Sequence, residues 1–260
     1  MKTPITYWGG KQGLVTTILP LIPTDHLTYV EPFFGGGAIF FAKAPSKVEV
    51  INDLNGFIVN FYRICQTEFE ALQERIHSTP FSRQCYKDAL VMWNNPHLFT
   101  DLEKAWAFYT LTNQGYSSRI GTWGYGTICP SNERRLKNKR EGFTTAYQER
   151  LEQVQIECSD ALKLLKLRDR PTTFFYLDPP YHNADMGHYG GYTERDFEDL
   201  LTACSKLEGK FLLSSYPSDI LKRYKEQHGW HQVEIDQKLS AGTKGKRKTE
   251  VLTANFPINS

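Results

Sequence analysis

Four consecutive residues, Asp178-Pro179-Pro180-Tyr181, combine a carboxylate, two rigid rings and an aromatic face. The run of apolar and β-branched residues before them, 172–177, predicts a buried strand. Proline has no N–H and pushes its predecessor out of the helical region, so this strand must end in a stiff turn. Carboxylate and carbonyl oxygens beside an aromatic face would suit a flat ring with an amino group. A Pro-Pro pair is also an ordinary strand terminator, so the motif alone leaves both interpretations open.

A glycine-rich turn lies between a predicted strand, residues 27–31, and a predicted helix, residues 38–44. Gly35 and Gly37 fit the first two glycines of the dinucleotide fingerprint G-x-G-x-x-G, but Phe40 occupies the third position. A strand, a glycine turn and a helix are typical of nucleotide-binding α/β folds. The missing third glycine disfavours a pyrophosphate-binding dehydrogenase.

Asp53 follows a second predicted strand, residues 48–51. An acid at this place, roughly 20 residues after the glycine turn, commonly binds ribose hydroxyls. A ribose site without a pyrophosphate site points to an adenosyl ligand such as S-adenosylmethionine. The alternative for Asp53 is an N-cap of the helix that follows, and both roles are compatible.

Two further positions have residues suited to a ligand. In Tyr7-Trp8-Gly9-Gly10-Lys11, the glycines permit close backbone approach and the lysine offers a positive charge, although a solvated lysine on a glycine turn explains the pattern equally well. Asp160 lies just after a predicted strand, residues 154–158. It could accept a hydrogen bond from an adenine amino group or cap the next helix.

The predicted order of elements gives an α/β fold with a mostly parallel, Rossmann-like sheet and an antiparallel edge made by the last strands. Between residues 57 and 113 four amphipathic helical segments interrupt the strand–helix alternation. We therefore expect one catalytic domain, residues 1–56 and 150–260, with an inserted, mostly helical subdomain at 57–149. The polar, glycine-rich residues 182–191 predict a loop that is a candidate mobile lid.

Basic residues gather in a segment that also contains several glycines and aromatic residues, 114–143, which we interpret as a loop. Over residues 119–141, six basic side chains face two acidic ones, in a chain whose formal net charge is only +2. Phosphate neutralisation and base contact need such a combination, so the segment favours nucleic-acid binding over a merely solvated loop. The predicted DNA contacts, including a second basic loop near residue 246, are Arg119, Arg134, Arg135, Lys137, Lys139, Lys246 and Arg247.

Composition excludes several classes of protein. The 260 residues are 40% hydrophobic, with no apolar run long enough to cross a bilayer and no signal peptide. The five cysteines have no Cys-x-x-Cys spacing, so we expect no disulfide framework, no metal site and a reducing, cytoplasmic location.

Four features of the sequence, taken in order, resemble the Dam-type (D12 class, α-group) adenine-specific DNA methyltransferases. They are Gly-Gly-Lys near the N-terminus, the Glu31-Pro32-Phe33-Phe34-Gly35-Gly36-Gly37 run, the two acids after predicted strands (Asp53 and Asp160) and Asp178-Pro179-Pro180-Tyr181. The resemblance covers about residues 5–60 and 150–256. It implies transfer of a methyl group from S-adenosylmethionine to N6 of an adenine flipped out of double-stranded DNA by a monomeric enzyme. It places catalysis at Asp178, Pro179 and Tyr181, and the cofactor at Tyr7, Trp8, Lys11, Phe34, Gly35, Gly37, Asp53, Asp160 and Asp178.

Three alternatives remain open at this point. The same chemistry could serve RNA or a protein amide, although the basic segments argue against a protein substrate. A catalytically silent nucleic-acid-binding relative is disfavoured by the intact Asp178, Pro179 and Tyr181. A GATC-type target is suggested by the family alone. The residues also leave open whether the enzyme serves restriction and modification, replication marking or phage self-protection.

Overall fold

The computed structural model describes residues 1–260 except 8, 117–118, 127–128, 182–190, 239–246 and 259–260. The predicted lid falls almost wholly outside the described residues, as do Trp8 and Lys246. Within the described residues the chain forms two compact units. Unit 1 comprises residues 1–19, 35–45 and 53–158, and unit 2 comprises residues 20–34, 46–52 and 159–260.

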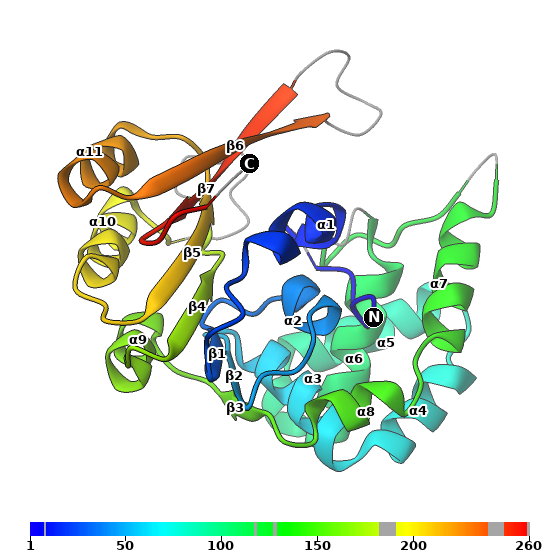
Figure 1. Ribbon diagram of the computed structural model, residues 1–260. Helices are drawn as coiled ribbons and strands as arrows, with labels where there is room; N and C mark the ends of the chain where they lie inside the picture. The colour runs from blue at the N-terminus through cyan, green and yellow to red at the C-terminus, as the bar shows by residue number, and fades with distance from the viewer. Residues whose placement is uncertain (8, 117–118, 127–128, 182–190, 239–246, 259–260) are drawn as a thin grey trace. The chain divides into compact units, whose positions relative to one another are not determined.

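The described strands form a seven-stranded sheet in the order β3-β2-β1-β4-β5-β7-β6. The pairs β1/β2, β1/β4 and β4/β5 are parallel, whereas β7 runs antiparallel to both β5 and β6. The predicted Rossmann-like sheet with an antiparallel edge is therefore confirmed (Figure 1). The strand bounds are Thr28–Glu31 (β1), Val48–Asn52 (β2), Gln155–Glu157 (β3), Thr173–Leu177 (β4), Lys210–Ser215 (β5), His231–Lys238 (β6) and Arg247–Ala254 (β7).

The order of parallel strands in unit 2 creates a topological switch point between β1 and β4. The chain continues from β1 to β2 on one side and from β4 to β5 on the other. In open α/β sheets, ligands bind outside the carboxyl ends of the strands at such a point. Those ends carry Glu31 on β1 and, directly after β4, Asp178.

Unit 2 buries its sheet under three helices, α9 (Ala161–Arg168), α10 (Glu194–Cys204) and α11 (Asp219–His228) (Figure 1). All five residues of β4 are buried, as expected for a central parallel strand. The helices contribute Leu165, Leu201 and Leu221 to one continuous apolar core with the strands.

Unit 1 is mostly helical, and its four central helices lie where the sequence predicts them. A buried aromatic cluster holds them together: the ring of Phe143 stacks on Phe69 at 5.0 Å and lies 5.7 Å from that of Tyr109. The helix bounds are Val15–Ile18 (α1), Ala38–Ala42 (α2), Gly56–Thr67 (α3), Phe69–Ser78 (α4), Arg83–Asn94 (α5), Asp101–Gln114 (α6), Ser131–Glu141 (α7) and Ala146–Leu151 (α8).

Two local predictions were wrong. The basic segment is not a loop throughout, because residues 131–141 form helix α7, in which Leu136 is the buried anchor. Its Glu, Arg, Lys and Leu residues are good helix formers, whereas the glycines that suggested a loop lie outside it. The apolar stretch at residues 14–21 predicts one helix over its whole length, but the α-helix found there is shorter. It is α1 flanked by single 3₁₀ turns, since Pro20 has no N–H to continue an α-helix.

Candidate active site

The Asp178 turn follows the end of β4, a strand whose five residues are all buried. Leu177, the last residue of β4, is fully buried, whereas the Asp178 side chain is half-buried. Pro179 and Pro180 follow without regular structure, as their missing N–H groups require. A rigid strand end therefore presents a carboxylate at the switch point.

Tyr181 turns back onto that carboxylate. Its hydroxyl donates to Asp178 Oδ1 at 3.3 Å and lies 3.0 Å from Ser214 Oγ on β5. Burial, followed by the neighbouring Asp178 carboxylate, raises the pKa of Tyr181 well above its usual value, so the phenol keeps its proton. The ring of Tyr216 meets the Tyr181 ring edge to face, with centroids 4.2 Å apart.

Sequence reasoning missed Ser214 and Tyr216. The available signal was the end of the neighbouring strand, Ser214-Ser215-Tyr216-Pro217, which has polar residues, an aromatic ring and a proline like the end of β4. Parallel strands bring their carboxyl ends to one edge. The pairing of Leu177 with Leu213 therefore places Ser214 beside Asp178.

A second acid lies beneath the switch point. Glu31, at the end of β1, is buried with 2% exposure and accepts a hydrogen bond from the Tyr29 hydroxyl at 2.8 Å. Burial is the main cause of the strongly raised pKa of Tyr176, and the carboxylates of Asp178, Glu31 and Glu250 also contribute. Carboxylates in a site of low dielectric stabilise positive charge, which an amino nitrogen acquires when it attacks a methyl group.

The glycine turn and Asp53 form a separate cluster in unit 1. Gly35 and Gly37 have φ values of +49° and +66°, which side chains rarely adopt. Asp53 Oδ2 accepts from the N–H of Gly35 at 2.8 Å, and Oδ1 accepts from the N–H of Asn55 at 2.9 Å. Burial raises the pKa of Asp53, while these backbone donors oppose the rise. The acid thus ties the turn to the start of α3.

Asp53 is not the N-cap of α3, as the alternative interpretation had it. Asn55 has that role, because its side chain accepts from the N–H of Phe57 at 3.0 Å. Asp160, in contrast, does cap its helix, with Oδ1 accepting from the N–H of Lys163 at 3.0 Å. The side chain of Asp160 is exposed, and its predicted contact with an adenine amino group stays a prediction.

Tyr7 packs against the glycine turn. A Cβ on Gly35 would lie 3.0 Å from Tyr7 Cδ1, and one on Gly36 would lie 3.3 Å from Tyr7 Cβ. Burial, with a smaller contribution from Asp53, raises the pKa of Tyr7 to about 12. At Gly35 the neighbouring ring and the positive φ both disfavour a side chain, whereas at Gly36 the ring alone does.

Lys11 is not the solvated lysine of the alternative interpretation. Its side chain is buried, with 6% exposure, and Nζ donates to the carbonyl of Gly9 at 3.1 Å. A buried cation of this kind is suited to an anionic group of a ligand. Phe34, the remaining predicted cofactor residue, belongs to unit 2, where it is 3% exposed and its N–H donates to the Asn52 carbonyl.

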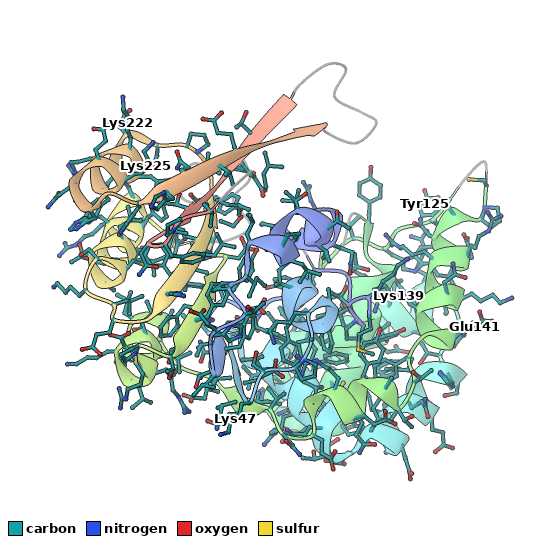
Figure 2. All side chains as sticks on the ribbon, viewed as in Figure 1. Lys47, Tyr125, Lys139, Glu141, Lys222 and Lys225 are labelled. Carbon is teal, nitrogen blue, oxygen red and sulfur yellow. The ribbon has the colours of Figure 1, made fainter. Side chains whose placement is uncertain are left out.

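The predicted DNA contacts fall into two groups on α7. Arg134 and Lys137 are exposed, and Lys137 lies 3.7 Å from Glu141 in a weak surface pair. Arg135 and Lys139 instead donate to the carbonyls of Asn113 and Thr3 within unit 1. Figure 2 shows Lys139 and Glu141 on different sides of the helix.

The other predicted cations provide less information. Arg119 is half-buried in the turn before Gly121, and the Arg119 carbonyl accepts from the Tyr86 hydroxyl at 3.2 Å. Arg247 begins β7, but its side chain is not among those that the structure describes.

Among the described residues, no group of His, Cys, Asp and Glu side chains is arranged to hold a metal ion, and no helix is long and apolar enough to cross a membrane.

The Rossmann-like sheet, the strand-end carboxylate and the glycine turn with its acid are the features expected of an amino-group methyltransferase. A model of the D12 class N6 adenine-specific DNA methyltransferase family matches residues 7–235. The chain belongs to this family, as the motifs predicted, and it is an enzyme that methylates N6 of adenine in DNA.

Individual relatives agree with this assignment. The type II methyltransferase M1.LlaDCHI of Lactococcus lactis subsp. cremoris is 27% identical, over 97% of this chain and 95% of that protein. The type II methyltransferase M.MjaIII of Methanocaldococcus jannaschii is 24% identical, over 97% and 99%. The DNA N-6-adenine-methyltransferase of Escherichia phage P1 is 24% identical over 91% of this chain, which spans only 33% of that protein.

Proposed function

We propose that the methyl donor is S-adenosylmethionine and that the acceptor is an adenine flipped out of double-stranded DNA into the Asp178 turn. The single observation that carries the acceptor assignment is the half-buried Asp178 carboxylate, held by Tyr181 at the carboxyl end of β4. A base inside a duplex cannot reach such a turn, so extrusion is required.

The residues of unit 1 fit S-adenosylmethionine by their chemistry. The glycine turn keeps its backbone open to a ligand, Asp53 offers carboxylate oxygens to ribose hydroxyls, and buried Lys11 offers a cation to a carboxylate. Tyr7 supplies an aromatic surface beside the turn. When bound, S-adenosylmethionine supplies an electrophilic methyl group on a sulfonium. Trp8, Phe34, Gly37 and Asp160 are further proposed contacts.

Asp178 and the carbonyl of Pro179 would accept the two N–H groups of the adenine amino group. In the free base the nitrogen lone pair is delocalised into the ring, which makes the nitrogen a poor nucleophile. Two acceptors favour a pyramidal nitrogen with its lone pair free to attack, and the Asp178 charge would stabilise the positive charge that develops there. As the N–C bond forms, the bond from the methyl carbon to sulfur would break to leave a neutral thioether, and the methylated nitrogen would then lose one proton to water. Positioning and electrostatics carry this mechanism without a covalent intermediate. The Tyr181 ring would stack on the extruded base.

DNA recognition is assigned to the expected inserted subdomain, residues 57–149. Arg134 and Lys137 are the side chains of α7 best placed to neutralise phosphates, because both are exposed. Arg135 and Lys139 support the fold around the N-terminal segment instead. We further propose that the enzyme acts as a monomer in the cytoplasm.

A competition assay tests this proposal. The enzyme is given labelled S-adenosylmethionine together with equal amounts of duplex DNA, single-stranded DNA and RNA of the same sequence, containing many adenine contexts. The expected result is methylation of the duplex, with an Asp178→Ala variant that binds the cofactor normally but turns over at least about 100-fold more slowly. Preferred methylation of RNA, or full turnover by Asp178→Ala, would contradict the proposal.

A further inference from the structure

Ser214 is a fully buried polar residue beside the Asp178 turn, and the reaction described above does not use it. It lies on β5, one residue after Leu213, which pairs with Leu177 of β4. Side chains alternate along a strand, so Ser214 shares a face with Leu212 and, across the pair, with Tyr176 and Asp178. Its hydroxyl lies 3.0 Å from Tyr181 Oη.

The direction of the hydrogen bonds follows from a count of protons. A phenol has one proton to donate, and that of Tyr181 is directed to Asp178 Oδ1, because an ionised carboxylate can only accept hydrogen bonds. The Ser214 hydroxyl must then be the donor to Tyr181 Oη. Burial and the adjacent carboxylates raise the pKa of Tyr181, so its proton is retained for Asp178.

We propose that Ser214 is a positioning residue for methyl transfer. Ser214 donates to Tyr181, Tyr181 donates to Asp178 Oδ1, and the carboxylate is thereby held in one rotation with Oδ2 presented to the adenine amino group. This inference rests on the proposed acceptor role of Asp178.

The chain of hydrogen bonds answers a specific need. The terminal torsion of an aspartate is broad, so a carboxylate at a strand end samples many orientations unless a donor fixes it. The 3.3 Å bond from Tyr181 is longer than a typical O–H···O bond, and bonds of catalytic groups often tighten only in the complex with substrate. Tyr216, packed edge to face on Tyr181, limits movement of the ring that carries the donor.

The same strand offers a matched control. Ser215 is also buried, with 2% exposure, but it points to the opposite face, and its hydroxyl has no hydrogen-bond partner within the described residues. Removing that hydroxyl changes the strand by the same atom without touching the Tyr181–Asp178 pair.

The test is a double-mutant cycle on single-turnover methylation of duplex DNA. We expect Tyr181→Phe to slow methyl transfer about tenfold, as for loss of one hydrogen bond to a charged group, and Ser214→Ala to slow it about three- to tenfold. Because Ser214 acts through the Tyr181 hydroxyl, the double variant should be no slower than Tyr181→Phe alone. Dissociation constants for DNA and S-adenosylmethionine should change less than about twofold.

Controls separate positioning from packing. Ser214→Cys keeps the side-chain shape with a weak donor and should be as slow as Ser214→Ala, whereas Ser215→Ala should match the wild type. Fluorescence of 2-aminopurine at the target position should show normal base flipping in every variant. A Ser214→Ala rate equal to the wild type, or rate reductions that multiply in the double variant, would overturn the proposal. Absence of any methylation by the wild type would instead contradict the proposed function.

Discussion

The glycine turn offers a sharp test of the cofactor assignment. A Gly35→Ala substitution places a side chain at φ +49°, in the left-handed region, at a cost of about 1–2 kcal/mol. The new Cβ would also lie 3.0 Å from Tyr7 Cδ1, closer than such contacts normally allow. Tyr7 must therefore shift, and Asp53, bonded to the Gly35 N–H, is disturbed with it.

Gly229→Ala is the matched control. Gly229 follows α11 with φ +65°, and a Cβ there would meet nothing within 4 Å. Both variants incur the same backbone cost, which corresponds to a fall in Tm of roughly 2–8 °C for a domain of this size. The collision with Tyr7 affects Gly35→Ala alone.

Thermal unfolding and calorimetric titration with S-adenosylmethionine distinguish the two effects. Both variants should melt at lower temperature, but only Gly35→Ala should lose cofactor affinity, by at least about tenfold. Wild-type affinity in Gly35→Ala would refute the assignment of this turn to the cofactor. An equal loss of affinity in both variants would show that the effect is one of general stability.

Two further predictions concern α7. Reversing the charge at Arg134 and Lys137 should weaken DNA binding. The slope of log K for DNA binding against log salt concentration should become shallower by about 0.9 for each phosphate that is no longer neutralised. The control is Lys166→Glu, an exposed charge reversal on α9 that should leave this slope unchanged in binding titrations from low to moderate salt. Burial, with Arg135 and Lys2 nearby, lowers the pKa of Lys139 to about 8. Between pH 8 and the ordinary lysine pKa the unfolded chain therefore binds a proton that the folded chain does not, so folding stability rises with pH. From pH 7 to pH 10 the free energy of unfolding of the wild type, measured with denaturant, should rise by roughly 2 kcal/mol relative to that of Lys139→Met. A difference between the two proteins that does not change with pH would contradict a buried, charged lysine.

The sequence predicted best those turns whose conformation is set by the residue types in the turn itself. The prolines after Asp178 determine where β4 ends, and the apolar and β-branched run before them favours a buried strand, so the place and conformation of the Asp178 turn were predictable. The glycine turn was predictable because a positive φ favours glycine, and Asp53 was predictable from its place directly after β2.

Contacts between distant parts of the chain were not predictable. Ser214 lies 33 residues from Tyr181, and nothing local distinguishes it from Ser215, which faces the other way. For the same reason, the sequence did not distinguish the cations of α7 that bond within unit 1 from those that are exposed. Only the folded helix shows that Lys139 reaches the carbonyl of Thr3 while Lys137 stays exposed. Composition gave the charge of that segment but not the face on which each charge lies.

The most direct test of the central claim is to follow the methyl group itself. The enzyme is incubated with unmethylated duplex DNA and S-adenosylmethionine bearing a deuterated methyl group. The DNA is then digested to nucleosides, which are analysed by mass spectrometry. We predict deuterated N6-methyladenine with the wild type and none above background with an Asp178→Ala variant that still binds the cofactor. A label found on cytosine, or no labelled adenine in any duplex sequence tried, would contradict the account.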